Sequence, residues 1–550
     1  MPKYWEWTED VLARFSDILS TASIRQAVYA SLYSYDKDLQ IMRAIFEGWC
    51  PDTNTFHTVE GEFYISLWDL KKLGGLPIVG EIYDETVSQL SILKSKTEEK
   101  NLTVLATCTF LFTAFHYLLK ESKDKGEVSA QQWIDFWCKW QVVYPPPVKS
   151  RRTTKNPPAS TQNPSGEIEP RSSDEWTEEE RSLFEKLACN DSRRAKFYLP
   201  AHLSCWLCIF VLPEDSDRLI RPATFEIASM MEEGRVFSLA ITVLASIYKG
   251  LNGLATSMNP GYSRSFFPTH YLYGWIANYF DTYHAINPSP TGPHMTKYSG
   301  PVGARNAKPE EARKLMHEGR KFDTKRFMLN KHKVDVLLDN GDLDALGLDY
   351  RASLRSSYLC LRLSNGFHLE PYNPHRFSRQ FGFCQDIPGV LNRGSDKPDV
   401  TCFEALKYWQ VFLFTGSMSR VYLPSPSFRW DENVTLGFTK WWKELYPKDL
   451  RKKVDILVHS TGSDHKTKKR DHHGDTRNQS REQAVPPKSK VVVPKAKGHI
   501  ENKHHSDSDS EIDPKHDRRG KRKVSVLDAD DVRLDAQIFE GVSSASRMPS

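Results

Sequence analysis

Apolar residues recur three and four positions apart over most of the chain, and this spacing predicts helices. Each predicted helix carries one apolar face that we expect to be buried. These faces are Leu39, Met42 and Phe46; Trp133, Phe136, Trp137 and Trp140; Leu183, Phe184 and Leu187; Val236, Ala240, Val243, Leu244 and Ile247; Leu272, Trp275, Ile276 and Tyr279; Phe403, Leu406, Gln410 and Leu413; and Phe438, Trp441, Trp442 and Leu445. The pattern predicts a mainly α fold with one or two small β elements.

The clearest non-helical segment is Thr55 to Ser66, with the sequence TFHTVEGEFYIS. Phe56 and Thr58 alternate toward a Glu60-Gly61 turn, and Phe63-Tyr64-Ile65 follows it, which predicts a short β-hairpin. Ser66 then begins a capping box with Asp69, in which each side chain bonds to the other residue's backbone N–H. The following helix is expected to end at Gly74-Gly75, because glycine adopts a positive φ at little cost.

Two polar stretches interrupt the helical pattern. Pro145 to Ser173 contains seven Pro and few apolar residues, so we interpret residues 145–173 as a Pro/Ser-rich linker or insertion. A capping box at Thr177 to Glu180 begins the helix that follows. The second polar stretch covers about 287–326. Residues 1–144 and 174–446 are therefore the two parts of a folded body, and residues 447–550 form a C-terminal tail.

Charge and aromatic content separate the tail from the body. The chain of 550 residues has a net charge of +5, yet the 92 residues from Pro447 to Ile538 hold 22 Lys and Arg against 16 Asp and Glu. The rest of the chain has a net charge of −1. The same 92 residues contain no Phe, Tyr or Trp, so they cannot bury enough apolar surface to offset the entropy lost on folding. We therefore expect a disordered basic tail.

Several features indicate an intracellular protein outside the membrane. The nine Cys are an odd number spread thinly over the chain, which favours reduced thiols over a disulfide framework. The N-terminal residues MPKYWEWTEDVLARF lack the apolar run of a signal peptide. The one membrane candidate, Leu102 to Leu119, contains four Thr and a His and is barely long enough to span, so a buried helix is favoured.

The hairpin region resembles the signature of the plant mobile domain, a family also labelled aminotransferase-like. The segment GEFYISLWDLKKLGGLPIVGE has the family's order of residues, and a later segment, YNPHRFSRQFGFCQDIP, resembles another family block. The matching positions are Gly61, Glu62, Ser66, Leu67, Asp69, Gly75, Leu76, Pro77, Tyr372, Pro374, Arg376, Gln380, Phe381, Gly382 and Gln385. Five such blocks keep the family's order over about residues 40 to 395, and the two polar stretches are departures from it.

The resemblance implies a helical domain found in plant transposons and in host proteins similar to the Maintenance of Meristems type. Those relatives are nuclear, and they are linked to transposon silencing and genome integrity in meristem cells. Some members are fused to, or work with, a PPP-type serine/threonine phosphatase. The resemblance implies no catalytic residues.

Two clusters have a chemical interpretation beside a structural one. Cys205 and Cys208, with His202 upstream, have the spacing of metal ligands, but no second pair completes a site, so core packing is favoured. Around 375–383, His375, Arg376 and Arg379 alternate with Phe residues, as in a nucleic-acid surface. The favoured alternative buries Phe377 and Phe381 in the core and leaves the arginines solvated or capping carbonyls. We find no motif for a cofactor, metal or catalytic group, so we expect a non-enzymatic protein without cofactors.

The tail carries two compact basic clusters, which indicate nuclear import or contact with DNA or chromatin. They comprise Lys466, Lys468, Lys469 and Arg470, and Arg518, Arg519, Lys521, Arg522 and Lys523. Serines precede acidic residues at 506–511, and we hypothesise that phosphorylation there weakens the basic clusters. A solvated tail without a specific role is the alternative.

Two functions follow from these observations. The first is a non-enzymatic nuclear interaction scaffold in transposon or gene silencing, genome stability and meristem maintenance. Its expected partners are nuclear proteins, with a PPP-type phosphatase among the candidates. The alternative is a transposon-encoded nucleic-acid-binding protein that assists mobilisation.

Overall fold

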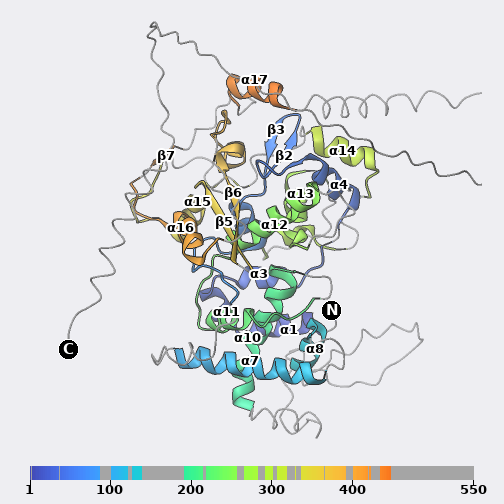
Figure 1. Cartoon of the computed structure of the whole chain (residues 1–550), viewed down its shortest axis with the longest axis vertical. Helices are drawn as coiled ribbons and strands as arrows, with labels where there is room; N and C mark the ends of the chain where they lie inside the picture. The colour runs from blue at the N-terminus through green and yellow to red at the C-terminus, as the bar shows by residue number, and fades with distance from the viewer. Residues whose placement is uncertain are drawn as a thin grey trace, which may run out of the picture. The chain divides into compact units, whose positions relative to one another are not determined.

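The computed structural model describes residues 1–446 except for 2, 36, 87–100, 122–126, 139–190, 215–217, 257–265, 281, 283–291, 301–305, 319–326, 328, 330–335, 365, 390, 392–399, 419 and 423–433 (Figure 1). The linker at 145–173, the capping box at 177–180, the predicted helix face at 183–187 and the tail at 447–550 lie outside the described residues.

In chain order the described elements are α1 (Tyr4–Arg14), α2 (Ser16–Thr21), α3 (Arg25–Ala30), α4 (Leu39–Gly48), β1 (Trp49–Cys50), β2 (Thr55–Thr58), β3 (Gly61–Phe63), α5 (Leu67–Gly74), α7 (Asn101–Glu121), α8 (Ala130–Trp137), α10 (Asp191–Trp206), η2 (Leu207–Val211), α11 (Thr224–Glu232), α12 (Leu239–Ala255), α13 (Thr269–Tyr279), η3 (His294–Tyr298), α14 (Pro309–Glu318), β4 (Val336–Leu338), α15 (Ala345–Ser353), β5 (Ser357–Leu363), β6 (Gly366–Tyr372), η4 (Pro374–Phe381), α16 (Cys402–Leu413), β7 (Arg420–Tyr422) and α17 (Leu436–Leu445). The predicted mainly α fold is confirmed.

One group of helices, α7, α8, α10 and α11, packs together beside α1 (Figure 1). The aromatic stripe predicted around residue 133 is buried here, and Trp133 donates from its indole N–H to the carbonyl of Ala201 over 3.0 Å. Phe110 of α7 stacks on Phe197 of α10 with ring centroids 4.2 Å apart. Trp140 lies outside the described residues. None of the described helices is long and apolar enough to cross a membrane.

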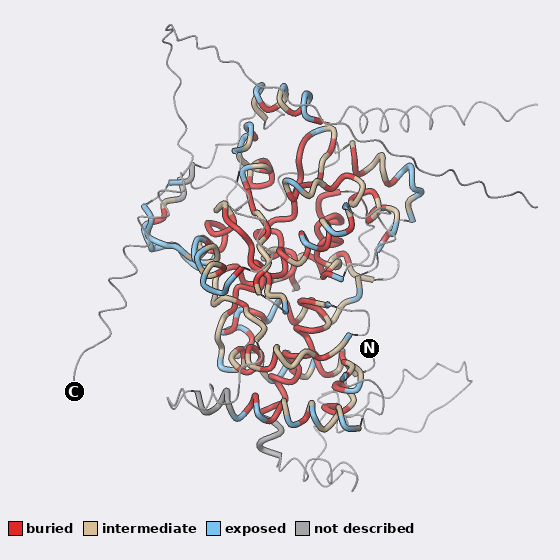
Figure 2. The backbone as a smooth tube through the Cα atoms, viewed as in Figure 1, coloured by how far each residue is buried: buried red, intermediate tan, exposed pale blue. Residues whose placement is uncertain are grey.

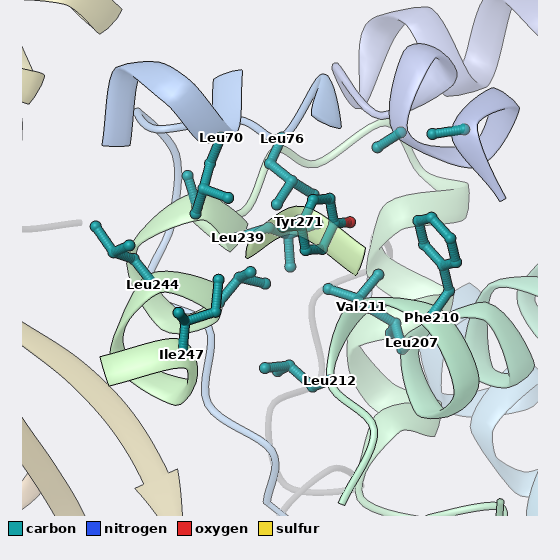
Figure 3. Packing of buried hydrophobic residues seen from close by; sticks show 14 of the residues in the cluster. Leu70, Leu76, Leu207, Phe210, Val211, Leu212, Leu239, Leu244, Ile247 and Tyr271 are labelled. Atoms are coloured by element: carbon teal, nitrogen blue, oxygen red, sulfur yellow. The ribbon is translucent and has the colours of Figure 1, made fainter. Parts of the chain in front are cut away.

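A second group is built around α12, which is buried on nearly all sides (Figure 2). Leu239 and Leu244 of this helix approach Leu70 of α5 and Tyr271 of α13 in the same apolar cluster (Figure 3). The predicted face at Ala240 to Ile247 is therefore confirmed as core. Val236 is an exception, because it precedes the helix and its carbonyl accepts a hydrogen bond from the N–H of Glu81 over 2.7 Å.

The described strands form three small antiparallel sheets. The predicted hairpin is confirmed as β2 and β3, and β1 joins it as a third strand. The other sheets pair β5 with β6 and β4 with β7. The β5–β6 hairpin packs against α12 and α16, so it connects the C-terminal elements to the central helix.

Four predicted core positions are wrong: Leu39, Phe403, Gln410 and Leu445 are exposed. Leu39 is 64% exposed, because it is the first residue of α4 and the buried face of that helix begins at Ile41. Phe403 is 68% exposed, because α16 buries Ala405 and Phe412 instead. Leu445 of α17 is also exposed, whereas Phe438 and Trp442 are buried as predicted. In α4 only Leu39 is wrong, because Met42 is buried as predicted; in α16 the spacing gave the right element but the wrong side of it.

The polar stretch at 287–326 includes described helices. Met295 and Tyr298 of η3 are buried, and Arg313 of α14 forms an ion pair with Glu47 of α4 at 2.7 Å. The ring of His317 hydrogen-bonds to the carbonyl of Ala44 over 2.8 Å. These parts of the stretch therefore belong to the folded body.

Candidate functional site

The first family motif folds as a turn, a capped helix and a glycine stop. Ser66 and Asp69 form the predicted capping box, with the hydroxyl of Ser66 accepting from the N–H of Asp69 over 3.1 Å and a carboxylate oxygen accepting from the N–H of Ser66 over 2.8 Å. The other carboxylate oxygen accepts from the hydroxyl of Tyr279 over 2.6 Å. Burial outweighs these hydrogen bonds and raises the pKa of Asp69 to about 6.

Two positions of this motif require glycine, because a side chain there would clash with a neighbouring residue. Gly75 ends α5 with φ of 70°, and a Cβ there would lie 2.6 Å from Cβ of Gln26. Gly61 has φ of 133°, and a Cβ there would lie 2.5 Å from a guanidinium nitrogen of Arg379. Leu76 is buried, and the carbonyl of Pro77 accepts from the N–H of Ala240 over 2.9 Å, which attaches the end of the motif to the start of α12.

The second family motif starts at Tyr372, whose hydroxyl connects two other segments. It donates to the carbonyl of Ser353 over 2.6 Å and accepts from the N–H of Leu67, in the first motif, over 3.4 Å. Pro374 stands in the first turn of η4, and Gly382 ends η4 with φ of 86°. The motif is therefore fixed at both ends.

Other residues of the second motif bond to nearby backbone. The carbonyl of the buried Phe381 accepts from the hydroxyl of Tyr350 over 3.3 Å. The side-chain amide of Gln385 donates to the carbonyls of His375 over 2.8 Å and Asp386 over 3.0 Å. These contacts fix the path of the chain after η4.

The two motifs, separated by almost 300 residues in the sequence, are in direct contact. The side-chain amide of Gln380 bonds to both backbone groups of Tyr64, accepting over 2.9 Å and donating over 2.7 Å. The ring of Tyr64 stacks on Phe377 with centroids 3.8 Å apart. We call this contact region, formed by 61–77 and 372–385, the motif junction.

A buried ion pair lies at the motif junction. Glu62 is almost fully buried, and one of its oxygens accepts from Arg376 over 2.7 Å and from the hydroxyl of Thr55 over 2.9 Å. His57 lies opposite Glu62 in the β2–β3 pairing, with its Nε2 atom 3.5 Å from the same oxygen. Burial alone would raise the pKa of Glu62, but His57, Arg376 and Thr55 lower it below its ordinary value.

Arg379 lies between two aromatic rings. Its guanidinium carbon is 5.0 Å from the centroid of Phe63 and 5.9 Å from that of Phe438. Burial lowers the pKa of Arg379 to about 10, against the attraction of Glu60 and Glu62. The arginines at 376 and 379 are thus held inside the fold, and the expectation that they are solvated or cap carbonyls is wrong. The expected burial of Phe377 and Phe381 is confirmed.

Helix α17 covers the hairpin side of the junction (Figure 1). Trp442 donates from its indole N–H to the carbonyl of Thr58 over 3.1 Å, and its ring lies edge-on to His57 at 5.0 Å between centroids. Phe438 packs beside Trp442 at 6.2 Å between centroids. The last described helix of the chain is therefore part of this site.

The Cys205 and Cys208 cluster is core, as favoured from the sequence. Both thiols are buried, and His202 forms a hydrogen bond of 3.0 Å with the hydroxyl of Thr8. Burial lowers the pKa of His202 to about 3, so the ring is neutral. In the described part of the chain no group of three or more His, Cys, Asp and Glu is arranged to hold a metal ion.

The sequence analysis did not predict that His57 of β2 and Cys50 of the neighbouring strand β1 lie at the motif junction. The hairpin prediction fixes His57 opposite Glu62 by counting back from the turn, so the signal was present. Nothing in the sequence placed Arg376 beside them. The basic clusters at 466–470 and 518–523, and the serines at 506–511, lie outside the described residues.

Comparison with known proteins gives one match. A family model described as the plant mobile domain matches residues 23–443, a range that contains both motifs and both polar stretches. Neither the curated proteins nor the solved structures that were compared with the chain gave a match. Since the matched range covers most of the 550 residues and contains the motif junction, this chain belongs to the plant mobile domain family.

Proposed function

We propose that this protein is a non-enzymatic nuclear scaffold that supports transposon or gene silencing, genome stability and meristem maintenance. Its partners are nuclear proteins, with a PPP-type serine/threonine phosphatase among the candidates. Membership of the plant mobile domain family supports the proposal.

One exposed helix face carries the scaffold proposal. Phe403, Val411 and Phe414 lie within one sector of α16 and the residue after it, and Phe403 and Phe414 are 68% and 56% exposed. The ammonium group of Lys407 lies 4.7 Å from the centroid of Phe403 on the same face. Several large apolar side chains on one exposed face are typical of a surface that binds another protein.

The opposite side of α16 is firmly attached to the body. Ala405 and Phe412 are buried, and the indole N–H of Trp409 donates to the hydroxyl of Ser238 over 3.1 Å. The carbonyl of Tyr408 accepts from the hydroxyl of Ser357 over 3.0 Å. A rigidly held helix with an exposed apolar face loses little conformational entropy on binding, which favours a docking role.

The polar residues of the motif junction also support a scaffold. Gln380 bonds to backbone, Asp69 caps a helix, and Arg376 is paired with Glu62. The side chains of Gln380 and Arg376 hold the two motifs together, which is a structural use of these groups.

The test is co-purification of proteins from plant nuclei with the full-length chain as bait. A Phe403→Asp/Phe414→Asp variant should lose proteins that the wild type recovers, because charge on the apolar face opposes docking. Leu436→Asp is the matched control, since Leu436 is an exposed residue on a different helix, α17. Recovery of the same proteins by the wild type and the α16 variant would contradict the docking role of α16.

Nuclear localisation is tested separately. Changing the basic residues at 466–470 and 518–523 to Ala should move a fluorescent fusion out of the nucleus. An unchanged nuclear signal would rule out import through these clusters.

The alternative, a transposon-encoded nucleic-acid-binding protein that assists mobilisation, is favoured by the location of the positive charge in the tail. DNA binding through lysine and arginine should weaken steeply with salt. A chain that ends at Tyr446 should then bind no DNA at low salt, whereas the full chain should. Flanking terminal repeats and an adjacent transposase frame in the genome would support this alternative.

A further inference from the structure

The three-stranded sheet places a thiol, an imidazole and a carboxylate on one face. Cys50 pairs with Thr55 across β1 and β2, and His57 pairs with Glu62 across β2 and β3. Paired residues in an antiparallel sheet point to the same side, and so do residues two apart on a strand. Cys50, Thr55, His57 and Glu62 therefore share a face.

Hydrogen bonds hold the imidazole of His57 in place. Its Nε2 atom lies 3.4 Å from the hydroxyl of Thr53 and 3.5 Å from the carboxylate of Glu62, and Trp442 covers one side of the ring. The second carboxylate oxygen of Glu62 is buried without a hydrogen-bond partner. A buried carboxylate next to an imidazole favours the protonated ring.

The pKa shifts of the thiol and of the imidazole both favour the charged forms of these groups. Burial disfavours the charged forms of both groups, but the attraction of His57 to Cys50 and Glu62 raises the pKa of His57 to about 9. Burial raises the pKa of Cys50, whereas His57, Thr53 and the backbone N–H of Asp52 lower it. The lowering effects prevail, so the pKa of this thiol lies below its ordinary value.

Several other charged groups near the sheet are paired or neutral, and Arg379 lies against the ring of Phe63 of β3. Arg376 of η4 is bound to Glu62. On neighbouring helices, Glu47 of α4 pairs with Arg313, and His317 of α14 contacts the ring of Phe56, which alternates to the opposite face from His57. Burial lowers the pKa of His317, so it adds no positive charge at neutral pH.

Cys50 differs from the other cysteines that the structure describes. Burial is the leading cause of a raised pKa at each of the others, which are Cys108, Cys138, Cys205, Cys208, Cys360, Cys384 and Cys402. Cys384 and Cys402 are exposed, whereas Cys50 is only partly accessible. Accessibility alone would therefore make Cys50 react more slowly than these two.

We propose that Cys50 is a reactive thiolate that exchanges with small disulfides, with His57 as its counter-ion and Glu62 as the group that positions His57. This site is separate from the scaffold role proposed above. In the exchange the sulfur of Cys50 attacks one sulfur of a low-molecular-weight disulfide such as oxidised glutathione. A mixed disulfide forms, the original S–S bond breaks, and the second sulfur leaves as a thiolate that takes a proton from water.

The first experiment compares three cysteines within the full-length wild-type chain. The native protein is alkylated briefly with iodoacetamide at pH 7, and the modified peptides are quantified by mass spectrometry. Cys50 should react about five- to tenfold faster than Cys384 and Cys402, because the thiolate is the reactive form and an ordinary thiol is only a few per cent ionised at this pH. A slower reaction at Cys50 than at these two cysteines would overturn the proposal.

A variant then tests the role of His57. In His57→Gln the reaction of Cys50 should slow about tenfold at pH 7 and recover as the pH is raised, because removal of the imidazolium returns the thiol to a higher pKa. The buried Cys205 and Cys208 report in the same sample whether the fold is intact, because iodoacetamide should modify them only if the chain unfolds. An unchanged rate at Cys50 would show that His57 does not activate it.

The last measurement tests the exchange itself. Incubation of the wild type with oxidised glutathione at pH 7 should give a glutathione adduct on Cys50 that dithiothreitol removes. Cys50→Ser should lose this adduct while its other thiols behave as in the wild type. Absence of the adduct on Cys50 in the wild type would overturn the exchange reaction.

Discussion

The side-chain amide of Gln380 accepts a hydrogen bond from the N–H of Tyr64 over 2.9 Å and donates one to the carbonyl of Tyr64 over 2.7 Å. It therefore satisfies both backbone groups of a residue that follows the edge of the β2–β3 hairpin. In an antiparallel sheet a neighbouring strand would make these two bonds. A single glutamine replaces that strand and connects the two family motifs.

Replacing this glutamine should destabilise the fold strongly. Gln380→Ala leaves the buried N–H and carbonyl of Tyr64 without partners, and each unpaired group costs about 1–3 kcal/mol. We expect the free energy of unfolding to fall by about 2–5 kcal/mol, measured by urea denaturation. Gln410→Ala is the control, because Gln410 is exposed on α16 and its loss should change stability by less than about 0.5 kcal/mol. Equal urea midpoints for the two variants would contradict this role of Gln380.

The ion pair between Glu62 and Arg376 should show strong coupling. Arg376→Met leaves the buried carboxylate of Glu62 without its main counter-charge, which should cost about 3–5 kcal/mol in unfolding free energy. Adding Glu62→Gln should recover part of that loss, so a double-mutant cycle should be non-additive. The exposed pair of Lys3 and Asp135, 3.7 Å apart, should give less than about 1 kcal/mol in the same cycle. Additive effects at 62 and 376 would show that the two side chains act independently.

Two buried histidines should make the protein sensitive to acid. Burial lowers the pKa of His202 and His270 to about 3, with Lys37 adding to the effect at His270. In the unfolded chain each ring takes up a proton below about pH 6.5, whereas the folded rings stay neutral down to about pH 3. Each histidine therefore contributes stability that is present above about pH 6.5 and is lost as the pH falls toward 3.

The slope of stability against pH measures this effect. His202→Gln should reduce the slope of unfolding free energy between about pH 4 and 6 by about 1.4 kcal/mol per pH unit, the value for one proton. A double variant that also carries His270→Gln should reduce it by about twice that amount. Parallel slopes for the wild type and both variants would mean that these rings titrate normally in the folded protein.

Two glycines should respond to alanine in opposite ways. At Gly75 the φ of 70° and the Cβ position 2.6 Å from Gln26 make an alanine strained, so Gly75→Ala should lower the unfolding free energy by more than about 1 kcal/mol. Gly253 lies inside α12, and a Cβ there meets nothing within 4 Å. Gly253→Ala should therefore raise stability by about 0.5–1 kcal/mol, the helix-propensity difference. Thermal and urea unfolding of both variants measure the two signs, and a stable Gly75→Ala would rule out the steric requirement.

The local features of the first motif could be predicted from sequence, because they depend on residues a few positions apart. The Glu60-Gly61 turn, the capping box of Ser66 and Asp69, and the stop at Gly75 are all present as predicted. Each is a backbone conformation or a short-range hydrogen bond that a side chain imposes on its neighbours. The order of the family blocks likewise indicates the family without reference to tertiary contacts.

The choice of buried face was less predictable. In α16 the spacing of Phe403, Leu406 and Leu413 is correct for a helix, but β5 and β6 pack on the side of Ala405. The size and position of the neighbouring elements decided which side is covered, and helical periodicity contains no information about them.

The sequence by itself determined the helical class, the hairpin, the helix ends and the family, because periodicity, capping and turns act over fewer than about ten residues. Tertiary structure alone decided that Gln380 bonds to Tyr64, that Arg376 pairs with Glu62, and that β1 adds Cys50 to the sheet face that carries His57. Contacts between residues 316 and 314 positions apart depend on how the packed helices bring the two motifs together. A single sequence carries no signal for such pairs, since every buried acid could pair with any of many bases until the fold selects one.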